Sequence, residues 1–116
     1  MDHTEILRRL AINDQRVLDD LFRAEADDED DPQPHGALDP RTLALVRLAA
    51  LAAVGGAVSS YGAQADAAFD SGASAEEMVD VLVGVVPVVG IPCVVAAAPK
   101  LALALGYSDE ALDQFG

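Results

Sequence analysis

The sequence predicts an all-α fold of about six helices that forms oligomers, and three observations lead to this prediction. Apolar residues recur at helical spacing through most of the 116 residues. Glycine and proline fall between these segments, where helices begin and end. Apolar residues make up 52% of the chain and aromatic residues only 4%, so Ala, Val and Leu must build the core. These small side chains bury little surface each, so we expect subunit contacts to complete the core.

Residues 1–24 are predicted to form an N-terminal helical segment. Apolar residues recur at helical spacing over 4–11 and again over 14–24. Asn13 and Asp14 lie between the two stretches and indicate a break or a cap.

An acidic linker is predicted over 25–37. Six of the seven residues in 25–31 are Asp or Glu, and two prolines follow without apolar periodicity. Pro32 stands where a calcium-binding EF-hand loop needs glycine, so we expect a solvated linker and no metal site. His35 lies in this linker and is expected to be solvated.

The remaining residues, 38–116, are predicted to form the main helical domain. Asp39 and Pro40 are typical of an N-cap followed by a first helical residue, and this helix should end at Gly55–Gly56. A second helix should cover about 58–71 and stop at Gly72. Its expected buried face carries the side chains of Tyr61, Ala65, Ala68 and Phe69.

Two longer helices and a short one complete the prediction. Ser74-x-x-Glu77 is a capping box that begins the first of them. Residues 81–89 are rich in valine and have strand propensity, but the capping box and the length favour a helix. Pro92 suits the first turn of the next helix, which should run through about Leu105. A short terminal helix is expected from Ser108.

The charge balance excludes several classes of function. The chain carries 20 acidic and 7 basic residues, a net charge of −13, which argues against binding nucleic acids or anionic membranes. Cys93 is the one cysteine, so the chain has no internal disulfide, Cys-x-x-Cys pair or thiolate zinc site. The sequence does not open with a secretory leader, so we expect a cytoplasmic protein.

Two uncharged stretches, 48–65 and 81–99, are long enough to suggest membrane spans. Three prolines, Pro87, Pro92 and Pro99, interrupt the second stretch, and the chain has no Trp for a membrane interface. We therefore expect helices that are buried in an oligomer rather than in a membrane.

Several motifs follow one another in a characteristic order. They are LDPRTLALVRLAALAAVGG from Leu38, then AAFDSGASAEEMVDVL, then Pro87 followed by Gly90-x-Pro92. On these motifs, the stretch from Leu38 to Gly106 resembles the carboxymuconolactone decarboxylase family, which includes the alkylhydroperoxidase D proteins. The resemblance implies an all-α fold that assembles into trimers or hexamers.

The resemblance also implies where the family's reactive residues would fall. The thiol-peroxidase branch uses a Cys-x-x-Cys pair, a His and a Glu, which keep a thiolate and a resolving thiol in place. Counted back from Gly72, the cysteines fall on Ala57 and Ser60, the His on Gln64, and the Glu on or beside Ala44. None of the four matches, so a two-thiol cycle within the chain is excluded.

Four residues are candidates for a site. Gln64 stands where the decarboxylase branch has a His; it cannot titrate but can hydrogen-bond a carboxylate, unless backbone or water simply satisfies it. Ser60 lies one turn earlier on the same face, or bonds back to its own helix. Arg47 can bind a carboxylate bidentately or make a structural ion pair. Cys93 is a candidate ligand-binding residue, or a small buried apolar one.

Two classes of function remain from the sequence. The first is a non-catalytic family member that forms a trimer or hexamer and binds a small ligand such as a carboxylate. The second is a lyase or decarboxylase acting on a small carboxylate or lactone, with Gln64, Ser60 and Arg47 as binding groups. A thiol peroxidase is a third and weaker hypothesis. No cofactor is expected in any of them.

Overall fold

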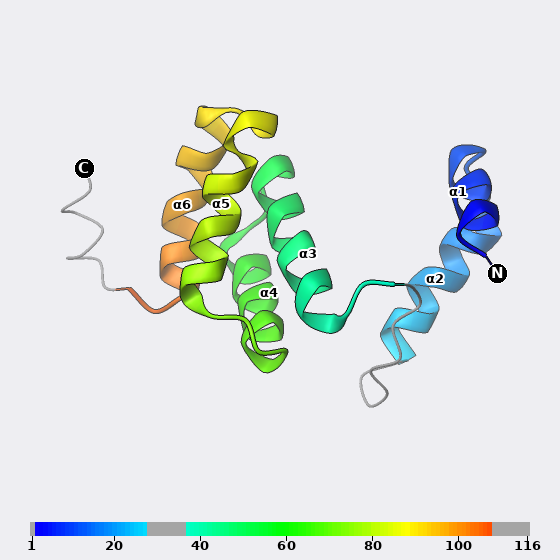
Figure 1. Cartoon of the computed structure of the whole chain (residues 1–116), viewed down its shortest axis with the longest axis horizontal. Coiled ribbons are helices and arrows are strands. Elements are labelled where there is room, and N and C mark those ends of the chain that lie inside the picture. Colours follow the sequence, from blue (N-terminus) through cyan, green and yellow to red (C-terminus); the bar gives the residue numbers. More distant parts are fainter. Residues whose placement is uncertain (1, 28–36, 108–116) are drawn as a thin grey trace. The chain divides into compact units, whose positions relative to one another are not determined.

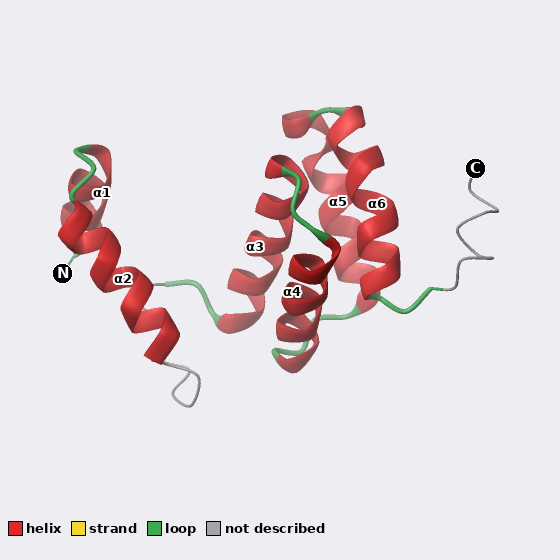
Figure 2. Ribbon diagram, turned by 180° about the vertical axis from the view of Figure 1, so that it is seen from behind, coloured by secondary structure: helices red, strands yellow, loops and turns green. Residues whose placement is uncertain are grey.

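A computed structural model describes residues 2–27 and 37–107, which form six α-helices and no strand (Figures 1 and 2). The all-α prediction is confirmed. In chain order the helices are α1 (His3–Ala11), α2 (Gln15–Asp27), α3 (Pro40–Val54), α4 (Val58–Asp70), α5 (Ala75–Val89) and α6 (Ile91–Ala104). The chain divides into two compact units, Met1–Leu38 and Asp39–Gly116.

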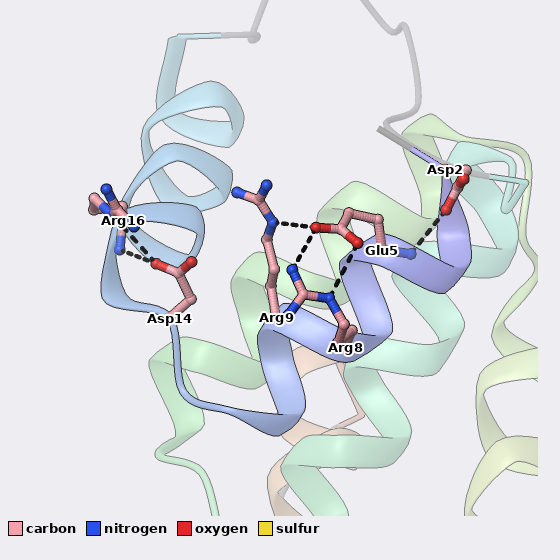
Figure 3. Close-up of polar contacts among 6 residues, drawn as sticks. All are labelled: Asp2, Glu5, Arg8, Arg9, Asp14 and Arg16. Carbon is pink, nitrogen blue, oxygen red and sulfur yellow. Dashed lines mark hydrogen bonds and ion pairs between the residues drawn. The ribbon is translucent and has the colours of Figure 1, made fainter.

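The first unit begins with a capped helix. The Asp2 carboxylate accepts a hydrogen bond of 2.8 Å from the backbone N–H of Glu5, at the N-terminus of α1 (Figure 3). Arg8 and Arg9 each donate to the Glu5 carboxylate at 2.8 Å. These hydrogen bonds lower the pKa of Glu5 to about 2. All three side chains reach solvent, so their ion pairs add little to stability.

The predicted break between the first two helices is confirmed. Asn13 has a φ of +59°, in the left-handed region that asparagine tolerates better than most residues. The Asp14 carboxylate accepts a hydrogen bond of 3.1 Å from the N–H of Arg16 at the start of α2 (Figure 3). The helix then continues to Asp27, three residues past the expected end at 24.

Some expectations fall outside the described residues. They include most of the acidic linker over 25–37, with His35, and the short helix expected from Ser108.

The second unit is a bundle of α3, α4, α5 and α6, which lie side by side in both views (Figures 1 and 2). α3 contacts the other three helices, and α6 also contacts α4 and α5. One large side chain from each helix is fully buried: Leu48, Tyr61, Met78 and Leu101. The rest of the core consists mainly of alanines, namely Ala44, Ala52, Ala65, Ala68, Ala73 and Ala97, together with Leu82.

The helix ends in this unit follow the predicted signals. The Asp39 carboxylate accepts a hydrogen bond of 2.7 Å from the N–H of Thr42, and Pro40 occupies the first turn of α3. Gly55 ends α3 with a φ of +82°. Ser74 and Glu77 form both hydrogen bonds of the capping box of α5.

One ion pair ties the starts of two helices together. Arg41 in the first turn of α3 pairs with Glu77, which also caps α5. Because both side chains are partly exposed, the pair chiefly fixes the position of Glu77.

The valine-rich stretch is helical as expected, because α5 runs from its capping box to Val89 with Pro87 inside it. The expectation for Phe69 is wrong, since this residue is 45% exposed while Tyr61, Ala65 and Ala68 are buried. Eight helical positions separate Phe69 from Tyr61, which turns it about 80° away from the centre of the buried face.

Within the described residues, no helix is both long and apolar enough to cross a bilayer. α5 has 15 residues and α6 has 14, whereas a membrane span needs about 20.

The capping box gives a testable contribution to stability. Replacing Ser74 by Ala removes the acceptor for the Glu77 N–H, and we expect the free energy of unfolding to fall by about 1 kcal/mol. Ser59→Ala, at an exposed position in the first turn of α4, is the matched control and should change it by less than about 0.5 kcal/mol. Urea denaturation of both variants measures the difference. Equal losses would mean that the capping box does not stabilise the bundle.

Candidate functional site

A cleft of about 300 Å³ lies in the second unit, between the end of α3 and residues 92–100 of α6. Tyr61 of α4 contributes to its wall. The other lining residues are Ala52, Ala53, Val54 and Gly55 from α3, and Pro92, Cys93, Ala96, Ala97 and Lys100 from α6. The cleft is therefore mostly apolar, with a thiol, an ammonium group and a phenol as its polar side-chain groups.

The α6 wall of the cleft follows from the spacing of its residues. Cys93, Ala96, Ala97 and Lys100 stand at positions i, i+3, i+4 and i+7, which places them on one helix face. Gly90 precedes the helix and Pro92 sits in its first turn, so Cys93 also lies in the first turn. The two alanines between the thiol and the ammonium group leave the space that the cleft occupies.

Lys100 connects α6 to the chain that leaves α3. Its ammonium group donates a hydrogen bond of 2.9 Å to the carbonyl oxygen of Gly56. A Cβ at Gly56 would lie 2.6 Å from a methyl carbon of Leu51, so this leucine side chain would have to move aside. The hydrogen bond to the Gly56 carbonyl holds the ammonium group at the cleft.

Tyr61 carries a buried hydroxyl group without a hydrogen-bond partner among the described residues. The residue is 0% exposed, and burial raises the pKa of the Tyr61 phenol. An unpaired buried hydroxyl costs about 1–3 kcal/mol, so a native protein rarely keeps one without a use for it. The side chain borders the cleft, but its hydroxyl group has no surface accessible to solvent.

The four site candidates that the sequence predicted do not lie together in the structure. Cys93 lines the cleft, whereas Gln64, Ser60 and Arg47 are half-buried elsewhere in the second unit and do not line it. The side-chain oxygen of Gln64 is buried and has no partner among the described residues.

Tyr61 and Lys100 were not among the site residues predicted from the sequence. Tyr61 was expected only on the buried face of α4, and a helical pattern does not distinguish a core tyrosine from one that borders a cavity. The spacing from Cys93 to Lys100 indicates that the two residues share one helix face. This face borders a cleft only because the end of α3 lies opposite it. No group of three or more His, Cys, Asp or Glu residues that could hold a metal ion occurs within 2–27 and 37–107.

Comparison with known proteins adds one finding. Residues 3–103 match the family model described as "Carboxymuconolactone decarboxylase family". The match covers most of the chain and begins well before Leu38, so it includes α1 and α2 as well as the four-helix unit. No curated protein and no solved structure matches the chain.

The unpaired hydroxyl of Tyr61 makes a prediction about stability. Tyr61→Phe removes a buried donor without a partner, so the free energy of unfolding should stay the same or rise by up to about 1 kcal/mol. Tyr107→Phe, at an exposed position, is the control and should have no effect. Thermal and urea denaturation of the ligand-free protein give both values. A clear loss of stability in Tyr61→Phe alone would show that the hydroxyl makes a hydrogen bond in solution.

Proposed function

The chain belongs to the carboxymuconolactone decarboxylase family, and from this premise we propose that it is a non-catalytic, homo-oligomeric member that binds a small carboxylate. The observation that carries the proposal is the composition of the cleft. Among its described lining residues, Lys100 carries a positive charge and none is His, Asp or Glu. A single ammonium group in an otherwise mostly apolar wall favours a negatively charged ligand.

The residues at the family's reactive positions support a non-catalytic role. The resemblance places the peroxidase cysteines at Ala57 and Ser60 and the proton-relaying residues at Gln64 and near Ala44. Ala44 is 4% exposed and packs within the core, so its neighbourhood is occupied by apolar side chains. A thiol-peroxidase cycle would need a second thiol, which the chain lacks.

The size and polarity of the cleft support a small ligand. Ligand sites are mostly apolar, with a few polar groups that fix orientation, and about 300 Å³ is the lower end of their range. Ala53, Val54 and Ala96 offer apolar surface for a short hydrocarbon chain, and Lys100 offers the charge that pairs with a carboxylate.

Exposed apolar residues on the α5–α6 hairpin support self-association. Large apolar side chains are exposed on both helices, and Val88 reaches 85% exposure. The exposed apolar residues of this hairpin are Val79, Val83, Val88, Ile91, Val95 and Leu103. No charge occurs between residues 81 and 99 to interrupt them. Apolar surface of this kind is typical of an interface, and members of the family are often oligomeric.

One observation favours the alternative, a lyase or decarboxylase. Gln64 occupies the position at which the family's decarboxylases carry a His, and its side-chain oxygen is buried without a partner among the described residues. A substrate that donates a hydrogen bond could complete it. We rank this second, because an amide cannot exchange a proton near neutral pH.

The oligomer is tested by light scattering at micromolar concentration. We expect a trimer or a hexamer of the 12.0 kDa chain, and added salt should preserve or strengthen it by screening the net charge of −13. Val83→Glu and Val95→Glu should dissociate it, because each buries a charge in an apolar interface. Ala63→Glu, on the exposed face of α4, is the control. A 12.0 kDa particle would contradict the proposal.

Carboxylate binding is tested by calorimetry with butyrate, and with butyramide as the uncharged compound of similar shape. Butyrate should bind and butyramide should bind at least about tenfold more weakly, because the hydrogen bond to a charged group is worth about 1.5–3 kcal/mol. Lys100→Met should remove this preference, whereas Arg47→Met should retain it. Equal binding of the two compounds by the unmodified chain would contradict the proposal.

A further inference from the structure

We propose that α5 packs antiparallel against α5 of a second copy of this chain, in a two-fold contact at which the two helices cross at Gly84. This inference deepens the proposed self-association and rests on it. It specifies which helix the exposed face of α5 meets and in which direction the two helices run. A two-fold contact pairs the subunits, so of the trimer and the hexamer it selects the hexamer.

The first observation is an exposed apolar face along α5. Its residues form two neighbouring rows at i, i+4 spacing, which are the ridges that pack between helices. One row consists of Val79, Val83 and Pro87, and the other of Asp80, Gly84 and Val88. All six residues are exposed, Val83 by 64% and Val88 by 85%. Asp80 carries the single charge in the two rows, so the face is apolar from Val83 onwards.

The second observation is the glycine in the middle of this face. Gly84 lies inside α5, where glycine weakens a helix relative to alanine. A Cβ at this position would have no described atom within 4 Å, so the packing of a single chain does not require glycine there. The absent side chain leaves a gap in one of the two ridges, through which a second helix can approach closely. A neighbouring helix therefore gives Gly84 a role that the single chain does not.

The third observation is Pro87, which lies three residues further along the same face. Pro87 is inside α5 and cannot donate a hydrogen bond to the carbonyl group of Val83. The glycine and the proline thus weaken α5 at adjacent points of one exposed surface. Burial of the valines beside them in a helix contact would offset this loss.

The charges on α5 favour a second copy in the antiparallel direction. Glu76 and Asp80 are exposed in the first half of the helix, and no charge follows from residue 81 to its end. In a parallel pair the two Asp80 carboxylates would lie side by side. In an antiparallel pair that crosses at Gly84, they lie eight positions apart, about 12 Å along the axis, which exceeds the Debye length of about 8 Å. The acidic half of each copy then faces the uncharged half of the other, so the surface is complementary to itself.

The direction of the contact is tested by cross-linking cysteines placed at equal distances from Gly84. In the Cys93→Ser background, Asp80→Cys and Val88→Cys are made singly and together, and each chain is treated with a bismaleimide that spans less than about 12 Å. The double variant should give covalent dimers on a denaturing gel, whereas neither single variant should. Ser59→Cys with Ala67→Cys, two exposed positions at the same spacing on α4, is the matched control and should give none.

The close approach at Gly84 is tested by adding one methyl group. Gly84→Ala should weaken the association of trimers into the hexamer at least about tenfold, because two added methyl groups meet at the crossing. Gly62→Ala is the matched control, since Gly62 is inside α4 and its Cβ would also have no described atom within 4 Å. Light scattering over a dilution series measures both. Alanine favours a helix over glycine, so neither variant should lower the melting temperature of the dissociated chain.

The outcomes separate this inference from the proposal on which it rests. Covalent dimers from Val88→Cys alone, which retains Asp80, would indicate a parallel pair and overturn the inference. An oligomer that gives no cross-link in the double variant, or that Gly84→Ala and Gly62→Ala affect equally, would overturn it and leave self-association standing. A 12.0 kDa particle would contradict both.

Discussion

The close approach of helices across alanine side chains is the constraint on which the rest of the second unit depends. Ala44 and Ala52 of α3, Ala65 and Ala68 of α4, and Ala97 of α6 are all buried in one cluster. Because these side chains are short, the helices pack closely around only a few large residues, which leaves other apolar side chains outside the bundle. Small side chains fill little space, and two features follow from this. Valines of the α5–α6 hairpin remain exposed, and Ala96 and Ala97 leave a cleft open.

The cleft also depends on where its helices begin and end. Gly55 ends α3 in the left-handed region, and the next residue, Gly56, accepts a hydrogen bond from Lys100 at its carbonyl oxygen. Gly90 and Pro92 determine the start of α6, and so place Cys93 two turns before Lys100 on one face. A shift of one residue in the start of α6 would turn this face by about 100° and take both the thiol and the ammonium group away from the end of α3.

Most of the fold could be predicted because its signals are local. Asp39–Pro40, Gly55 and the Ser74–Glu77 capping box each act within one helical turn, and the structure contains all of them. The site was harder to predict, since it depends on which helices face one another. Tyr61 and Lys100 border one cleft only through the packing of α3, α4 and α6. Gln64 and Ser60 were expected at a site because of family positions that they do not match, and Arg47 because it is a charge within an apolar helix. The cleft includes none of the three.

A core made of alanine has a consequence for how the chain responds to its own concentration. Where subunit contacts supply part of the burial that keeps a chain folded, association and folding are one linked equilibrium. Dilution then lowers the melting temperature, and newly made chains are most vulnerable to proteolysis before they meet partners. The amount of this protein in a cell would in that case set its own lifetime, because each additional copy protects the others.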